Sequence, residues 1–243
     1  MLSVACHTSS HPPTYVPRDA ALRALPLYFY PSRVADRPPR AFIFFLGNDV
    51  AFWAPHQELA WRLAGDGYTV VGLDLRGYLA RLPMPAARRD SAFAADIGPL
   101  IARARAEVGG DTLPAIVGGH SFGAEVALWI ALHTPPPRLV GVLAMSTRAS
   151  GHLFVTPQDL LNYEAKGEGS FSTVQIAHDL PPSVRIAIVR GAHDKFAYHD
   201  SAFVAAGGPR LRRFVVPFGS HSLRSLVVAG PVVERAVEFL LGG

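Results

Sequence analysis

Three polar residues stand directly after apolar runs in this sequence, and together their side-chain types could cleave an acyl bond. Ser121 lies in GGHSFGAE, Asp194 in GAHDKF and His221 in FGSHSL. A serine hydroxyl is a weak nucleophile at neutral pH, so it requires a neighbouring base, which in turn requires a group that orients it. A histidine and a carboxylate supply these two roles, so the three types suit nucleophilic attack on a carbonyl.

The residues around Ser121 favour a nucleophile on a tight turn over a serine that begins a helix by chance. The spacing Gly-Xaa-Ser-Xaa-Gly is weak by itself, because a chain with 22 glycines can contain it by accident. Here PAIVGG (114–119) predicts a buried strand, and AEVALWIAL predicts a helix that begins at once. Gly119 and Gly123 allow the sharp turn that exposes a serine at a helix N-terminus.

The elements that must position these residues alternate regularly along the chain. Strands are predicted at 26–30, 41–46, 68–74, 114–119, 138–145, 184–190 and 211–217. Helices are predicted at 55–64, 90–108 (interrupted by Pro99), 121–133, 200–206 and 222–241. Continuous aliphatic strands that alternate with helices are typical of a mostly parallel sheet covered on both faces. Asp194 and His221 follow later strands than Ser121 does, in the order expected of this architecture.

Length and composition indicate one globular domain. The chain has 243 residues, of which 49% are hydrophobic and 17% charged, which is enough to bury a substantial core. We expect residues 1–25 to form a poorly ordered lead-in and residues 26–243 to form the domain. Residues 146–183 are longer than an ordinary connection, and they are either a small lid or a surface excursion with one short helix.

Charge and motif content exclude several classes of function. The net charge of +4 comes from scattered arginines, which favours a solvated basic surface over nucleic-acid binding, although attraction to an anionic lipid or substrate stays open. No phosphate-binding or dinucleotide-binding glycine loop is present, so no nucleotide cofactor is expected. His193 and His199 flank Asp194 without a third ligand at metal spacing, so we also expect no metal site.

The sequence gives little support for export or membrane insertion. Cys6 is the single cysteine, so no intrachain disulfide is possible. The sequence contains no run of 18 apolar residues, which an integral membrane segment would require, and no signal peptide is recognisable. A cytoplasmic protein is therefore favoured. LSVAC resembles the end of a lipoprotein signal, which leaves a periplasmic or lipid-anchored protein open if the true start lies upstream.

GHSFG, GAHD and GSHS, in this order on successive strand ends, resemble the α/β-hydrolase superfamily over residues 26–241. The resemblance implies an α/β-hydrolase fold, which has a mostly parallel, twisted sheet of about eight strands flanked by helices, although the sequence has seven clear strands. It also implies an oxyanion hole made of two backbone amides, those of Phe122 and Asn48. Many members carry His-Gly where this chain has Leu46-Gly47, but an amide donor requires no particular side chain.

Four apolar residues are candidates for lining a substrate pocket. They are Phe52, Trp53, Phe154 and Leu161. Packing in the core or at the rim is equally compatible with Phe52 and Trp53. Asp200, six residues after Asp194, is expected to cap a helix N-terminus rather than to take part in chemistry.

These observations predict a cofactor-independent serine hydrolase that cleaves a carboxylic ester or related acyl bond through a covalent acyl-enzyme, on a small-molecule or lipid acyl substrate. Similarity of LPLYFYP, VVGLDLRGYL and SFGAE to the bacterial virulence-protein VirJ-like branch keeps an aminoacyl-phospholipid hydrolase open, and a peptidase of the same fold is a further alternative. The competing class is a non-catalytic binding protein or scaffold. The sequence does not indicate an oligomeric state.

Overall fold

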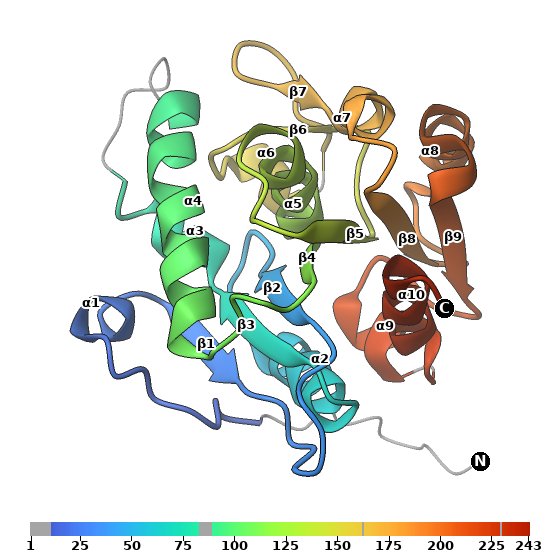
Figure 1. The fold of residues 1–243 in the computed structure, drawn as a ribbon. Coiled ribbons are helices and arrows are strands. Elements are labelled where there is room, and N and C mark those ends of the chain that lie inside the picture. The colour runs from blue at the N-terminus through green and yellow to red at the C-terminus, as the bar shows by residue number, and fades with distance from the viewer. Residues whose placement is uncertain (1–10, 83–88, 162, 229) are drawn as a thin grey trace, which may run out of the picture.

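A seven-stranded sheet forms the centre of the molecule (Figure 1). The computed structural model describes residues 11–82, 89–161, 163–228 and 230–243. The strands lie in the order β1-β3-β2-β4-β5-β8-β9; β1 pairs antiparallel with β3, and the other pairs are parallel. They are β1 (Leu27–Tyr30), β2 (Phe42–Leu46), β3 (Thr69–Leu73), β4 (Ala115–His120), β5 (Leu139–Met145), β8 (Arg185–Gly191) and β9 (Leu211–Val216).

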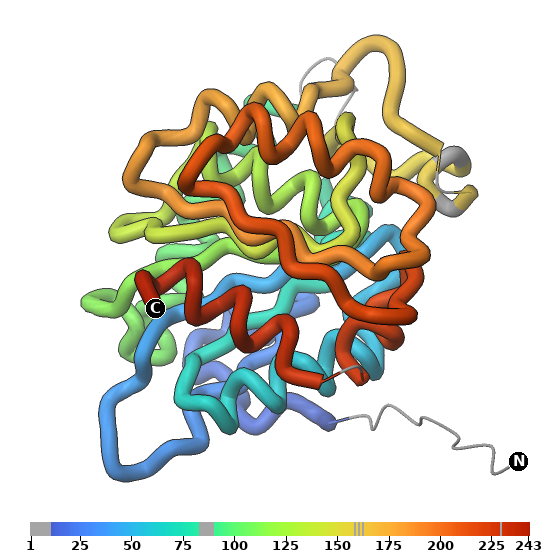
Figure 2. The backbone as a smooth tube through the Cα atoms, turned by 90° about the vertical axis from the view of Figure 1, so that its right-hand side faces the viewer, coloured from blue at the N-terminus to red at the C-terminus, as the bar shows by residue number. Residues whose placement is uncertain are grey.

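Helices cover both faces of this sheet, as its apolar strands require (Figure 2). One face packs against α1 (Ala20–Arg23), α3 (Leu75–Leu79), α4 (Arg89–Glu107), α5 (Phe122–His133), α7 (Thr173–Asp179) and α8 (Asp200–Gly207). The other packs against α2 (Ala54–Gly65), α9 (Leu223–Val228) and α10 (Val232–Leu241). Every residue of β2, β3 and β4 is buried, which is why these strands read as unbroken apolar runs. Across the described ranges, no helix combines the length and the hydropathy needed to cross a membrane.

The strands lie where the sequence predicts them, but two helix predictions and the strand count need correction. The main sheet has seven strands in the described residues, not about eight. Helix α4 continues through Pro99 instead of stopping there, and the residue before this proline is Gly98, which has no Cβ to meet the proline ring. The helix predicted at 222–241 is two helices, α9 and α10, since Gly230 has a φ of +95° and Pro231 starts the second.

The prediction of a poorly ordered lead-in is wrong for residues 11–25, while residues 1–10 lie outside the described residues. Helix α1 falls in this segment, and Leu22 is buried against the core. The Tyr15 hydroxyl donates a 2.7 Å hydrogen bond to Glu107 on α4, and Tyr15 forms a β-bridge with Phe29. Burial and these two contacts fix a segment whose sequence has no periodic pattern.

The long connection between β5 and β8, at the top of Figure 1, contains more secondary structure than expected. It forms the two-stranded ribbon β6 (Ser150–Gly151) and β7 (Phe171–Ser172), with α6 (Pro157–Leu160) between the strands and α7 after them. A Cβ added to Gly151 would lie 2.8 Å from the Glu125 Cβ, so the ribbon packs closely on α5. We call residues 146–183 the insert.

Gly72→Ala tests how tightly the apolar side chains pack on β3. A Cβ at this position would lie 2.2 Å from the Phe52 ring, so we expect the substitution to lower the free energy of unfolding by about 1–3 kcal/mol. Urea denaturation measures the loss. Phe52→Leu makes room beside Gly72, so Gly72→Ala should be less costly in that background. Equal losses in both backgrounds would contradict this packing.

Candidate active site

Ser121 occupies a strained turn between β4 and α5. Its φ is +53° and its ψ is −120°, a backbone conformation that residues other than glycine rarely adopt. A Cβ on Gly119 would lie 2.3 Å from the Gly123 carbonyl oxygen, and one on Gly123 would lie 2.2 Å from the Gly47 oxygen. Neither position therefore has space for a larger residue. The turn exists because both flanking residues are glycines.

His221 joins Ser121 and Asp194 into one hydrogen-bonded arrangement. The His221 Nε2 lies 3.0 Å from the Ser121 Oγ. Its Nδ1 lies 3.2 and 3.3 Å from the two carboxylate oxygens of Asp194. The Asp194 side chain is buried, whereas that of His221 is 19% exposed. The structure thus brings together three residues that are 73 and 27 positions apart in sequence.

Arg190, which sequence reasoning missed, is a second partner of Asp194 beside His221. Its NH1 donates a 3.2 Å hydrogen bond to Asp194, its Nε a 2.7 Å bond to Asp200 and its NH2 a 2.8 Å bond to the Thr147 carbonyl. The expectation that Asp200 caps α8 is wrong, because its carboxylate is buried against Arg190 and a half-exposed Arg213. In the sequence, the feature that could have indicated this role is the position of Arg190 at the end of the apolar run VRIAIVR.

Electrostatics keep Asp194 ionised. Burial by itself would raise its pKa, but the hydrogen bond and charge of His221, the Phe196 N–H and the Arg190 charge together lower the pKa well below its ordinary value. His120 shows the opposite balance, since burial and the nearby His221 lower its pKa to about 3. The neutral His120 ring lies 2.8 Å, by its Nε2, from the His221 carbonyl oxygen and supports that loop.

The two predicted amide donors lie beside the turn. Within the described part of the chain, the structure gives neither the Asn48 N–H nor the Phe122 N–H a hydrogen-bond acceptor. The Asn48 side chain folds back and accepts bonds from Val50 and Ala51, which fixes the loop. The close approach of the Gly47 oxygen to Gly123 brings this loop against the start of α5. The described residues contain no group of three or more His, Cys, Asp or Glu side chains that could hold a metal.

The family model described as serine aminopeptidase, S33, matches residues 50–202, more than half of the 243-residue chain. The chain belongs to this family. The matched range includes Ser121 and Asp194 and ends before His221. This is a family of α/β-hydrolases, so the resemblance expected from the sequence is confirmed, and membership supports hydrolysis as the chemistry of the chain. No curated protein sequence matches it.

Solved structures share the α/β-hydrolase fold of this family member at low sequence identity. The apo form of Thermogutta terrifontis esterase 2 is 18% identical with a TM-score of 0.61, over 88% of this chain and 88% of that one. The esterase domain of a Rhodothermus marinus protein is 12% identical with a TM-score of 0.58, over 88% and 97%. A thioesterase domain from the curacin biosynthetic pathway is 16% identical with a TM-score of 0.59, over 87% and 94%.

The four predicted pocket residues of this S33 family member lie in different environments. Phe52 is buried in the core, stacked on Tyr28 with ring centroids 4.8 Å apart, so its assignment to a pocket is wrong. Trp53 is 43% exposed at the start of α2, and Leu161 is 63% exposed on the insert. Phe154, in the insert, lines two cavities.

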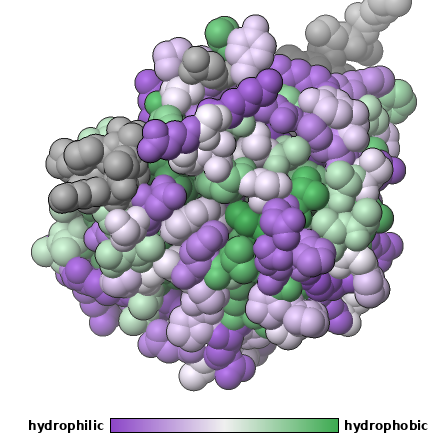
Figure 3. Space-filling view, turned by 90° about the horizontal axis from the view of Figure 1, so that it is seen from above, coloured by the Kyte–Doolittle hydropathy of each residue, from purple (hydrophilic) through white to green (hydrophobic). Residues whose placement is uncertain are grey.

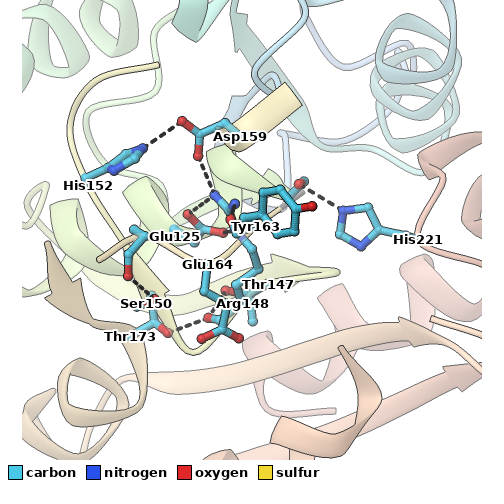
Figure 4. A network of polar contacts seen from close by, with 12 residues as sticks. Glu125, Thr147, Arg148, Ser150, His152, Asp159, Tyr163, Glu164, Thr173 and His221 are labelled. Carbon is cyan, nitrogen blue, oxygen red and sulfur yellow. Dashed lines mark hydrogen bonds and ion pairs between the residues drawn. The ribbon is translucent and has the colours of Figure 1, made fainter. Parts of the chain in front are cut away.

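A buried ion cluster fastens the insert to the helix that follows Ser121 (Figure 4). Arg148, which is 1% exposed, donates bonds of 2.5 and 2.8 Å to Glu125 on α5 and a bond of 2.9 Å to Asp159 in the insert. His152 and Thr156 complete the hydrogen bonding of Asp159. Burial would raise the Asp159 pKa, but these bonds outweigh it and lower the pKa well below its ordinary value.

Replacing Arg148 with Met tests how much this cluster stabilises the fold. Two buried carboxylates would lose their cation, so we expect the free energy of unfolding to fall by about 3–5 kcal/mol in urea denaturation. Arg213→Met is the matched control, because that side chain is 49% exposed and its contact with Asp200 is 3.4 Å long. The control should lose less than about 1 kcal/mol. If both variants lose a similar amount of unfolding free energy, the buried cluster does not stabilise the fold more than an exposed ion pair does.

Proposed function

We propose that this chain is a serine hydrolase that cleaves a carboxylic ester or related acyl bond through a covalent acyl-enzyme. The observation that carries the proposal is the 3.0 Å contact between the His221 Nε2 and the Ser121 Oγ, with Asp194 on the other ring nitrogen. This geometry lets a neutral imidazole accept the serine proton as the oxygen attacks. Ser121 would be the nucleophile, His221 the base and Asp194 the orienting acid.

The reaction would proceed in two balanced halves. In the first, the Ser121 Oγ bonds to the substrate carbonyl carbon, the bond to the leaving group breaks, and His221 returns the proton to that group. In the second, water attacks the acyl-serine, His221 accepts the water proton, and the carboxylic acid leaves as Ser121 is reprotonated. The Asn48 and Phe122 amides would donate to the oxyanion in both halves.

The buried charges favour this division of roles. His221 becomes a cation when it accepts the proton, and the ionised Asp194 beside it stabilises that cation. The same neighbours that lower the Asp194 pKa, including Arg190, make this carboxylate a poor proton acceptor. The proton would therefore stay on the imidazole, from which it can be returned.

Esters are the preferred substrate class because structures of the same fold include named esterases, although the family description names aminopeptidases. A peptidase and an aminoacyl-phospholipid hydrolase are the alternative substrate classes, and a scaffold is the alternative without turnover. A scaffold has no need of a base aligned on the serine oxygen. Matched ester, aminoacyl-ester and aminoacyl-amide substrates distinguish the three classes of enzyme.

Covalent labelling with fluorophosphonates tests the proposal before a substrate is known. We expect the wild-type chain to form a phosphonyl-serine in the peptide containing GGHSFGAE, because the adduct mimics the tetrahedral intermediate. Mass spectrometry of the intact chain and of its peptides detects it. Ser121→Ala and His221→Ala should abolish labelling, and acidic pH should slow it, since a protonated imidazole cannot act as a base. Labelling that survives Ser121→Ala, or a folded wild type inert to probes of several sizes, would overturn the proposal.

Asp194→Asn and Asp200→Asn form a matched pair, because both carboxylates contact Arg190 but Asp194 alone of the two contacts His221. We expect Asp194→Asn to reduce kcat by about 10³–10⁴-fold, since an amide no longer selects the imidazole tautomer. Asp200→Asn should lower the stability while changing kcat much less. Steady-state kinetics and thermal unfolding of both variants measure this. A larger loss of kcat in Asp200→Asn than in Asp194→Asn would show that Asp194 is not the orienting acid.

A further inference from the structure

An apolar cavity of about 270 Å³ lies between α3, the start of α4 and residues 153–155 of the insert. Its main lining side chains are Leu79, Leu82, Phe93, Leu153, Phe154 and Val155. Two alanines and Arg76 also line it, so a single one of the described lining residues is charged. Figure 3 shows the molecule from the side of the insert, where hydrophobic side chains gather within a polar surround.

Two residues that line the cavity contact neighbours of the residues proposed to donate to the oxyanion. On one side, the Arg76 NH1 donates a 3.3 Å hydrogen bond to the carbonyl of Asp49, the residue after Asn48. On the other, the Phe154 ring stacks on His152 with centroids 4.4 Å apart, and His152 lies 5.8 Å from the Phe122 ring. The walls of the cavity are thus connected, through Asp49 and through His152, to the two segments that carry the amides.

A second cavity, of about 650 Å³, lies on the other side of Phe154 and differs in chemistry. Its lining includes Glu164, Lys166, Tyr163 and Tyr198, together with Phe196, whose ring centroid lies 5.3 Å from that of His221. An aliphatic chain placed there would displace water from charged and hydroxyl groups without replacing their hydrogen bonds, which is unfavourable. Of the two spaces, the smaller one is suited to an aliphatic group.

We propose that the apolar cavity holds the acyl chain of an ester whose acyl group is a medium-length aliphatic chain, with Phe154 as the wall that separates it from the second cavity. The inference rests on the proposed function. At about 30 Å³ for each atom-sized group, the volume has room for on the order of nine of them. Each methylene that enters should raise kcat/KM by about fourfold until the cavity is full.

Filling the cavity tests the inference. We would measure kcat/KM for p-nitrophenyl esters with acyl chains of increasing length, from acetyl upward, in the wild type and in Ala92→Trp. The indole would occupy the space between α4 and the insert, so the increase with chain length should disappear while acetyl ester hydrolysis changes less than about threefold. Ala80→Trp, from an exposed position on the same lining, gives a second filled variant in case the first does not fold.

Lys166→Trp is the matched control, because it adds the same side chain to the second cavity. It should leave the dependence on acyl length unchanged. A second substrate series, acetate esters of alcohols of the same lengths, varies the leaving group alone. If Ala92→Trp and Ala80→Trp alter the alcohol series rather than the acyl series, or alter neither, the inference is overturned.

The labelling experiment keeps the two proposals distinguishable. A wild type that reacts with small fluorophosphonates but keeps its acyl-length profile in the filled variants contradicts the acyl cavity and leaves the serine hydrolase intact. A folded wild type that neither labels nor cleaves any ester contradicts both.

Discussion

The close approach of three backbone segments at Ser121 is the constraint on which the site depends. The serine has a positive φ, and the backbones of Gly47 and Gly123 approach so closely that no side chain fits between them. This contact holds the Asn48 loop against the start of α5 and presents the Ser121 oxygen towards His221. The strain is borne by the surrounding sheet, whose strands β2 and β4 are buried throughout.

Two buried arginines organise the polar groups around this turn. Arg190 connects Asp194, Asp200 and the Thr147 carbonyl, while Arg148, the next residue after Thr147, connects Glu125 on α5 with Asp159 further along the insert. The acid, the insert and the helix that follows the serine are therefore linked through two adjacent residues in the segment that follows β5. Both of these buried arginines have carboxylate partners, which offset the cost of removing their charges from water. Phe154, which lines both cavities, lies in the insert that Arg148 joins to α5.

Local sequence determined most of the architecture and the identity of the three reactive residues. Runs such as FIFFL and TVVGL predict buried parallel strands because both faces must be apolar, and the structure places strands there. Ser121, Asp194 and His221 could be recognised because each follows a strand, and strand ends are where this fold presents side chains. The outcomes at Pro99 and Pro231 were harder to predict, since both prolines follow a glycine, yet the chain stays helical at Pro99 and turns at Gly230.

Tertiary structure alone decided which polar and aromatic residues support the site. Phe52 and Phe154 look alike in sequence, yet Gly72 leaves room for one in the core while the insert places the other between two cavities. Arg190 and Arg148 are single charges at the ends of apolar runs, and their value depends on carboxylates that arrive from distant segments. Strand and turn propensities act between neighbours in the chain, so sequence patterns can report them. Packing and ion pairing act between residues that only the folded chain brings together.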